Sequence, residues 1–224
     1  MTDKMQRWSG AFARKVRERF GSRVRFIGIQ GSHRRGEASQ DSDIDMVVIL
    51  DRLAMEDLQA YRELVRALPE SGKMCGFISG KEQLSSWPRA DLFQFYYDTQ
   101  AIYGDLGEIF SVPTREEAGQ ALKVGAANLY HAACHCYLFE QGKAATLAAL
   151  YKGAFFLLQA LVFYRSGIYY AEKTQLRGHL SGQEEHILQG SMARGQIARL
   201  KEEELTEYFE RLISWCADVL TVMK

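Results

Sequence analysis

The sequence predicts an α+β fold in which a small mixed sheet with flanking helices is followed by an all-α helical bundle. Strand-like segments are confined to the first half of the chain, where they alternate with helical patterns. Long helical patterns fill the second half, and the turn "SVPT" separates the two regions. We therefore predict an α/β domain over residues 1–112 and a helical bundle domain over residues 113–224, with the boundary near 111–114.

The first half reads as helix, strand, short helical turn, strand, helix and strand. Apolar residues recur at a helical period up to Gly21, "RVRFIGIQ" alternates like a half-buried strand, and "DIDMVVIL" ends as a fully apolar one. The predicted elements are a helix at 3–20, strands at 23–30, 43–50 and 73–80, and a helix at 55–68.

The segment from 81 to 104 is ambiguous from its pattern. "DLFQFYYD" fits either a helix with aromatics on one side or an aromatic strand, and "AIYG" fits a short strand. The aromatic residues are expected in the core, with stacking on a nucleotide base as the alternative. They are Phe93, Phe95, Tyr96, Tyr97 and Tyr103.

The second half offers three long helical patterns, at 114–140, 144–165 and 202–222. A glycine-interrupted stretch before the last of them is expected to contain shorter helices. Helices in this number and order predict a bundle.

Composition argues against a non-specific nucleic-acid binder and against a membrane protein. The 224 residues carry 28 basic and 28 acidic side chains, so no net field favours non-specific nucleic-acid binding or a membrane surface. The longest apolar segment, 144–164, is interrupted by Lys152 and Gln159, short of the ~18 apolar residues of a membrane span. The charged N-terminus lacks the apolar core of a signal peptide, which leads us to expect a cytoplasmic protein without a membrane partner.

The four cysteines are expected to be buried thiols rather than a disulfide framework. The run from His131 to Cys136 has the residue types of a metal site. On a helix, however, Cys134 and Cys136 point ~200° apart, which favours packed helix residues over metal ligands.

The stretch "GSHRRGEASQDSDID", residues 31–45, carries the chemistry. Alternation along a strand places Asp43 and Asp45 on one face, with Ile44 facing the core. Two carboxylates this close repel each other unless a cation lies between them, and such oxygen ligands suit Mg²⁺ together with substrate phosphates. A two-metal site of this kind aligns and neutralises a phosphoryl transfer.

The upstream residues suit a phosphate site. Gly31 lets the backbone approach a ligand closely, and Ser32 would lie at the first turn of a short helix. Arg34 or Arg35 could add a guanidinium to the same polyphosphate, and Gly36 ends the turn. His33 is expected to be an exposed turn residue, with phosphate contact as the alternative.

"GSHRRGEASQDSDIDMVVI" resembles the Gly-Ser…Asp-x-Asp motif of the DNA polymerase β-like nucleotidyltransferase superfamily. The order of domains is similar to the streptomycin/spectinomycin adenylyltransferase type. The resemblance implies that Asp43 and Asp45 are the catalytic, metal-binding residues and that ATP or another nucleoside triphosphate is a substrate. It further implies nucleotide binding by Gly31, Ser32, Arg35 and Ser42, and by Lys173, which ends "YRSGIYYAEK".

One departure concerns the third carboxylate, which the superfamily takes from the next strand and uses as base. In "MCGFIS" either Gly76 or Cys75 stands at that position, according to register. Possible substitutes on other elements, among which the sequence selects none, are Glu82, Asp91, Asp98, Glu116 and Glu117. For the last two, stabilisation of a helix N-terminus is the favoured role.

Two functions from different classes follow. The first is an Mg²⁺-dependent transfer of a nucleoside monophosphate, AMP from ATP, to a hydroxyl of a small acceptor such as an aminoglycoside. The second is a catalytically impaired, antitoxin-like nucleotide-binding regulator. Ribonuclease activity ranks third, because Arg177 lies two residues from His179 and nine from His186, outside the Arg-x4–6-His spacing. The acceptor, the base preference and the oligomeric state stay open, a homodimer included.

Overall fold

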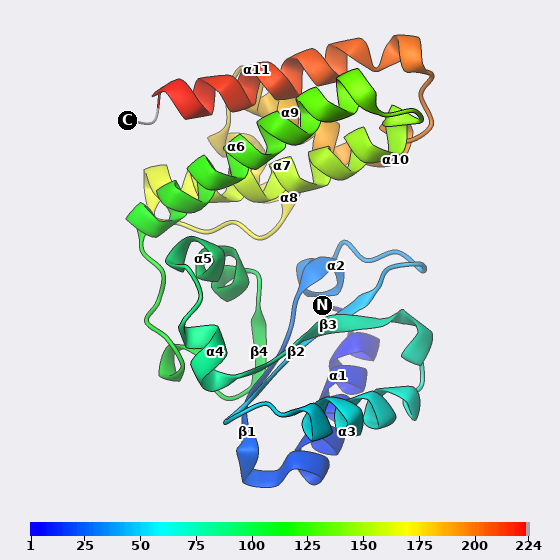
Figure 1. The fold of residues 1–224 in the computed structure, drawn as a ribbon, viewed down its shortest axis with the longest axis vertical. Coiled ribbons are helices and arrows are strands. Elements are labelled where there is room, and N and C mark those ends of the chain that lie inside the picture. Colours follow the sequence, from blue (N-terminus) through cyan, green and yellow to red (C-terminus); the bar gives the residue numbers. More distant parts are fainter. Residues whose placement is uncertain (223–224) are drawn as a thin grey trace. The chain divides into compact units, whose positions relative to one another are not determined.

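The computed structural model of the chain describes residues 1–222, and it has the predicted α+β class (Figure 1). The chain divides into two compact units. The α/β unit comprises Met1–Pro88 and Phe95–Val112, and the helical unit comprises Arg89–Gln94 and the chain from Pro113 onward. The predicted domain bounds, 1–112 and 113–224, stay a prediction.

A four-stranded sheet in the order β3-β2-β1-β4 forms the centre of the α/β unit. Strand β1 pairs antiparallel with β2 and β4, whereas β2 and β3 are parallel. The sheet is therefore mixed, as the sequence predicts. The strands are β1 (Val24–Ile29), β2 (Ile44–Leu50), β3 (Met74–Gly80) and β4 (Gln100–Tyr103).

Helices α1 (Asp3–Phe20) and α3 (Met55–Arg66) cover one face of this sheet, where they complete its hydrophobic core. Phe12 and Val16 of α1 pack against a strand face that includes Met46, in a cluster whose members are almost fully buried. Burial of such aliphatic and aromatic side chains contributes ~1.5–3 kcal/mol each. The core thus fixes the face of β2 toward which Ile44 and Met46 point.

Shorter elements complete the α/β unit. They are the helices α2 (Gly31–Arg35) and α4 (Lys81–Ser85) and the 3₁₀ turns η1 (Gly21–Arg23), η2 (Ser71–Lys73) and η3 (Leu106–Glu108). The ambiguous "DLFQFYYD" is helical, within α5 (Arg89–Tyr97). Phe93 and Phe95 are buried, in agreement with the expected core role, and Phe93 packs on Phe163 inside the helical unit. Tyr96 and Tyr97 are half-buried, and the expectation was wrong for Tyr103, which is exposed.

The helical unit contains the three predicted long helices. They are α6 (Arg115–Phe139), α7 (Lys143–Ser166) and α11 (Thr206–Val222). The stretch between the last two holds α8 (Lys173–Leu176), η4 (Arg177–His179), α9 (Gln183–Met192) and α10 (Arg194–Ile197), followed by η5 (Glu202–Glu204). Helix α7 is long and apolar enough to cross a membrane, and 61% of its most apolar 18-residue stretch is buried inside the structure. The core helix of a globular protein can have the same length and composition, so α7 is only weak evidence for a membrane span.

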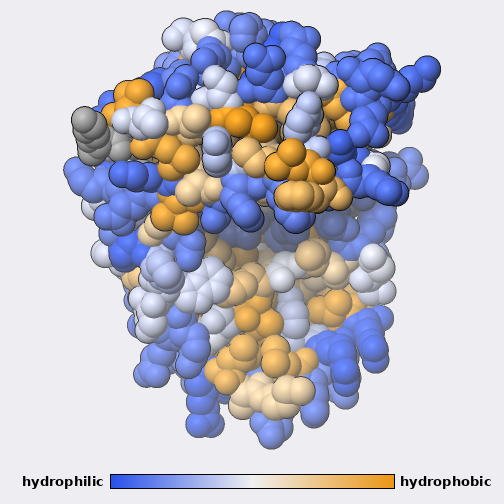
Figure 2. Space-filling view, turned by 45° about the horizontal axis from the view of Figure 1, so that its top comes forward, coloured by the Kyte–Doolittle hydropathy of each residue, from blue (hydrophilic) through white to orange (hydrophobic). Residues whose placement is uncertain are grey.

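The surface mixes polar and apolar side chains, as Figure 2 shows for one face, where hydrophobic patches lie among hydrophilic residues. Exposed apolar residues include Tyr137, Leu138 and Phe139 at the end of α6. The cysteine prediction was partly wrong: all four thiols are free, but Cys75 is exposed and only Cys136 and Cys216 are fully buried.

Candidate active site

Asp43 and Asp45 lie at the beginning of β2, on either side of the buried residue Ile44. Ile44 is 3% exposed and belongs to the core beneath α1 and α3. Since side chains alternate along a strand, both carboxylates point to the opposite face of the sheet. Asp43 is exposed to solvent and Asp45 is half-buried. Both carboxylates are therefore at least partly accessible at the surface of the α/β unit.

The Gly31–Ser32 turn meets Asp45 directly, because β1 ends beside the start of β2. Ile29 pairs with Met46, and the Gln30 backbone N–H donates to the Asp45 backbone carbonyl oxygen over 2.9 Å. The chain then enters α2 through Gly31 at φ +71°, where a Cβ atom would lie 2.1 Å from the Asp45 Oδ2 atom. Glycine is thus required at this position for two reasons. Other residues rarely adopt this φ, and any Cβ atom would overlap with the Asp45 carboxylate.

A buried ion pair holds the turn in place. The Arg35 Nη1 atom donates to both carboxylate oxygens of Asp98, over 2.8 and 2.6 Å, and both side chains are more than 90% buried. Asp98 Oδ2 also accepts from the Gly31 backbone N–H over 3.4 Å. Burial raises the pKa of the Asp98 carboxyl, and the adjacent Arg35 guanidinium opposes that shift.

This pair gives Arg35 a role that the sequence did not predict. The structure buries its guanidinium and binds it to Asp98, so Arg35 anchors the turn. The predicted contact between Arg35 and the triphosphate stays a prediction. The sequence named Asp98 only as a possible substitute acid. It did not predict that Asp98 binds Arg35 and the Gly31 backbone. Sixty-three residues separate Asp98 from Arg35, so no local pattern reports the contact.

The other predicted nucleotide residues lie on both sides of the turn. Ser32 is half-buried in α2, where its carbonyl accepts from the Glu37 amide over 2.9 Å. The Ser42 hydroxyl accepts from the Ser39 amide over 2.9 Å and closes the loop that precedes Asp43. Arg34 donates from Nη2 to the Tyr97 carbonyl oxygen over 3.2 Å, which adds a second tie between α2 and the end of α5.

Strand β3 supplies no acid next to Asp45. The register pairs Asp45 with Cys75 and Met46 with Gly76. Met74 and Ile78 pack on the helix-covered core, so alternation places Cys75, rather than Gly76, on the carboxylate face. Within residues 1–222, no group of three or more His, Cys, Asp and Glu side chains is arranged to hold a metal ion. A bound metal would therefore need further oxygen ligands from substrate or water.

The structure gives the five substitute acids different settings. Glu82 and Asp91 are exposed on α4 and α5, and Asp98 is committed to the buried pair. Glu116 is exposed in the first turn of α6. Glu117 accepts from the Arg89 Nε atom over 2.6 Å, which is the main reason why its pKa is lowered, and from the Thr114 amide over 2.7 Å. Glu117 thus caps the α6 N-terminus, the role favoured from the sequence.

Lys173 lies in the helical unit, at the beginning of α8. Its ammonium nitrogen is 4.4 Å from the centre of the Phe155 ring, a cation–π contact. Nearby, the buried Gln159 amide donates to the Tyr170 and Ala171 carbonyl oxygens over 2.8 and 3.1 Å. These contacts fix the segment that leads to Lys173, and its predicted contact with nucleotide phosphates stays a prediction.

The sequence profile of the nucleotidyltransferase domain family matches residues 11–89, which include α1 from residue 11 onward, the glycine turn, both aspartates and β3. Residues 11–89 form a nucleotidyltransferase domain. This domain carries the Gly-Ser…Asp-x-Asp motif of the polymerase β-like superfamily, and the structure joins the two halves of the motif at Gly31 and Asp45.

Two relatives extend the comparison. A protein adenylyltransferase, MntA, of Thermococcus cleftensis is 42% identical over 62 residues, which cover 26% of this chain and 61% of that protein. The chain thus matches about three fifths of this curated relative. The structure of spectinomycin adenyltransferase from Enterococcus faecialis, determined with ATP and spectinomycin, superposes with a TM-score of 0.57 at 13% identity, over 94% of this chain and 98% of that one. The nucleotidyltransferase domain and the helical unit together therefore share that enzyme's fold.

Proposed function

We propose that the protein is an adenylyltransferase, which transfers AMP from ATP to a hydroxyl group of an acceptor. The observation that carries this proposal is the contact between the two halves of the motif: Gly31 lies against the Asp45 carboxylate at an accessible edge of the sheet. A triphosphate bound at the turn would then have two carboxylates beside it. The adenylyltransferases similar in sequence and in fold support adenine as the base.

The donor atoms at this edge suit Mg²⁺. Asp43 and Asp45 offer carboxylate oxygens on one face, and this hard cation prefers oxygen ligands, keeps several waters and binds substrate phosphates. When bound, the cation would neutralise phosphate charge and help to orient the reacting groups. The two aspartates would hold it, and the absence of a third acid on β3 would leave more of its coordination to phosphate and water.

The proposed reaction is an in-line displacement at the α-phosphorus of ATP. The acceptor hydroxyl oxygen forms the new P–O bond, the bond to the β-phosphate bridging oxygen breaks, and pyrophosphate leaves with the electron pair. The hydroxyl proton must pass to a base, for which the face beside Asp45 offers Cys75 and solvent but no further carboxylate from β3. We expect slow turnover for this reason, since a positioned base contributes ~10²–10⁴-fold.

We propose a small molecule with several hydroxyls, such as an aminoglycoside, as the acceptor. The fold relationship to spectinomycin adenyltransferase over nearly the whole chain supports this class. A protein hydroxyl is the competing acceptor, because the curated relative is a protein adenylyltransferase. Lys173 is proposed as a further phosphate contact. We also propose a cytoplasmic location.

A second candidate is a nucleotide-binding regulator without turnover. The residues of β3 favour it, because Cys75 rather than an acid lies beside Asp45 on the carboxylate face. Cys75, the residue on the carboxylate face, cannot supply hard oxygen ligands. Such a protein would bind ATP through the turn and the aspartates and release no pyrophosphate.

One experiment separates these candidates. The protein is incubated with α-labelled ATP and Mg²⁺, with separate panels of aminoglycosides and of proteins, and label transfer is measured beside pyrophosphate release. We expect labelled acceptor with the wild type and none with Asp43→Ala. Asp41→Ala is the matched control, because Asp41 is an exposed acid in the same loop, two residues before Asp43.

The same samples report binding without turnover. A ligand at 100 times its Kd stabilises the folded protein by about 2.7 kcal/mol, which a thermal shift detects. ATP-dependent stabilisation of the wild type without product would support the regulator. Each candidate assigns the Asp43 carboxylate to the nucleotide complex. If Asp43→Ala keeps both label transfer and ATP-dependent stabilisation, both candidates are contradicted.

A further inference from the structure

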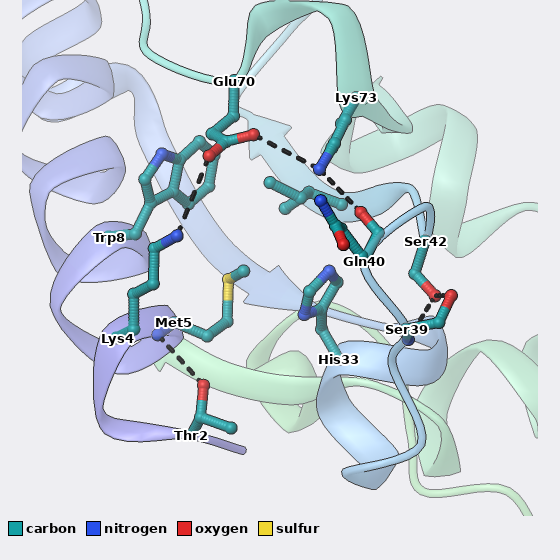
Figure 3. A pocket seen from close by; sticks show the side chains of 11 residues that line it. Thr2, Lys4, Met5, Trp8, His33, Ser39, Gln40, Ser42, Glu70 and Lys73 are labelled. Atoms are coloured by element: carbon teal, nitrogen blue, oxygen red, sulfur yellow. Dashed lines mark hydrogen bonds and ion pairs between the residues drawn. The ribbon is translucent and has the colours of Figure 1, made fainter.

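A pocket of about 180 Å³ lies in the α/β unit behind the glycine turn (Figure 3). It is bounded by the first turns of α1, by His33 of α2, by the loop 39–42 and by the turn 70–73, and Ile44 contributes to its lining. Ile44 faces the core, whereas the aspartates on either side of it face the other way. The pocket therefore lies on the opposite side of the β2 start from the candidate active site.

Apolar side chains form one wall of the pocket. Met5 and Ile44 are 8% and 3% exposed. Trp8 presents its indole between Met5 and Glu70 (Figure 3). The indole is fixed, because its ring stacks on Phe12 with 5.7 Å between centroids and Nε1 donates to the Pro69 carbonyl oxygen over 3.4 Å. A cavity of ~150 Å³ accommodates a benzene molecule. The volume thus suits one aromatic ring with a small substituent.

Cationic groups form the rim. Lys4 and Lys73 contact the same carboxylate, Glu70, at 3.9 and 3.5 Å, and Lys73 also donates to the Gln40 carbonyl oxygen over 2.7 Å. An ammonium has three donors, so both lysines retain hydrogen-bonding capacity. Two cations against one acid leave a single positive charge. The half-buried His33 ring points toward the pocket (Figure 3), and among residues 1–222 it makes no hydrogen bond.

Glu70 holds this arrangement in an unusual backbone conformation. Its φ of 65° is the only positive value at a non-glycine position in the described part of the chain. Side chains rarely adopt this region, and such outliers gather at ligand sites. Here the conformation sets the Glu70 carboxylate between the two lysines, which keeps both ammonium groups at the rim (Figure 3).

We propose that this pocket binds a small aromatic carboxylate, with its ring against Trp8 and its carboxylate at Lys4 and Lys73. A single negative charge matches the excess charge of the rim, whereas a phosphate dianion would exceed it. The bound molecule would touch α2 through His33 and the loop before Asp43 through Ser42. On the basis of the proposed function, occupancy would thereby alter nucleotide binding at the glycine turn.

Calorimetric titration of the whole protein tests the ligand class. The probes are benzoate and indole-3-carboxylate, each paired with its neutral amide. We expect Kd values of ~0.1–1 mM for the acids, as ligands of this size allow. The amides should bind at least ~10-fold more weakly, because they lose the charge-assisted contacts. Equal affinity for acids and amides, or no binding of acids below 10 mM (about ten times the expected upper limit), would overturn the proposal.

Two variants assign the contact to the rim. Lys73→Met and Lys4→Met each remove one ammonium, and Lys81→Met on α4 is the control outside the pocket. Acid affinity should fall ~10-fold in each rim variant and stay unchanged in the control. Lys4 is 83% exposed, so its variant keeps the test valid even if loss of the Lys73–Gln40 contact loosens the loop. Unchanged affinity in both rim variants would contradict the assignment.

A separate titration tests the connection to the active site. The Kd of ATP with Mg²⁺ is measured with and without saturating indole-3-carboxylate, and we expect a change of at least ~5-fold, with a reciprocal change in acid affinity. Acid binding without ATP binding would contradict the proposed function alone. Binding of both with no mutual effect would contradict only the regulatory connection.

Discussion

Neighbouring strands β2 and β3 run parallel in continuous register, yet only β2 carries acids at the candidate active site. Asp45 pairs with Cys75, and both lie on the same face. The β2 acids follow a loop that meets the glycine turn, whereas β3 turns at Gly76 into a backbone conformation that excludes any Cβ. Strand β2 thus places Asp45 beside the glycine turn, whereas β3 presents Cys75 at the paired position on the same face.

The largest expected effect is loss of activity in Asp45→Asn. The substitution keeps the shape beside Gly31 and removes the charge that would hold Mg²⁺, so transfer should fall by at least ~10²–10³-fold. Label transfer from ATP measures it, with ATP affinity in the same buffer. Activity within ~3-fold of the wild type would show that the Asp45 carboxylate is not needed for transfer. The proposed functional difference between β2 and β3 would then be contradicted.

A large effect on stability is expected for Asp98→Ala, which removes the anchor of the turn next to β2. The buried Arg35 guanidinium would lose its main partner, at a cost of ~3–5 kcal/mol in the free energy of unfolding. Urea denaturation measures the loss. The double variant Arg35→Met/Asp98→Leu is the control, and it should recover much of the stability because no charge remains buried.

Gly76→Ala tests the exclusion on β3. The new Cβ would lie 2.0 Å from the Met46 carbonyl oxygen and the backbone φ is +134°, so the strand pair must shift. We expect a loss of ~2–3 kcal/mol in unfolding free energy, measured by urea denaturation. Gly72→Ala in the preceding turn, where a Cβ meets nothing within 4 Å, is the control.

Cys75→Asp would give β3 the acid that β2 has. Its carboxylate would lie beside Asp45 on the open face, where it could bind the cation or accept the hydroxyl proton. We expect transfer to rise ~10-fold, measured by label transfer, with Cys75→Asn as the control for side-chain shape. A decrease in the Asp variant alone would show that repulsion between carboxylates outweighs any gained ligand.

The smallest effect concerns Asp57 in the first turn of α3, an acid with a structural role. Arg23 donates to Asp57 over 2.6 and 2.9 Å, and these bonds lower the pKa of Asp57 from 3.8 to about 2. The lowered pKa stabilises the folded state above pH ~4, and this contribution is lost as the pH falls through 2. Asp57→Asn should cost ~1–2 kcal/mol at pH 6 and almost nothing at pH 2, by urea denaturation at both values.

Sequence patterns identified most of the elements because each pattern is local. The alternation of 43–50 with Ile44 inside predicts where both aspartates point, and the structure has β2 at Ile44–Leu50. The segment 81–104 was ambiguous because a short aromatic run has no decisive hydrophobic period. In the structure the aromatic run is part of helix α5, and its Phe93 packs on Phe163 in the helical unit. The anchoring role of Arg35 was not predicted, because its partner Asp98 lies 63 residues away.

By itself the sequence determined the α+β class, the glycine turn and the pair of aspartates, since each follows from neighbours within a few residues. Only the tertiary structure decided that Arg35 is an anchor, that Cys75 rather than Gly76 lies beside Asp45, and that a pocket with a cationic rim lies behind the turn. These features depend on contacts between distant segments, and long-range packing and strand register leave no local trace in the sequence.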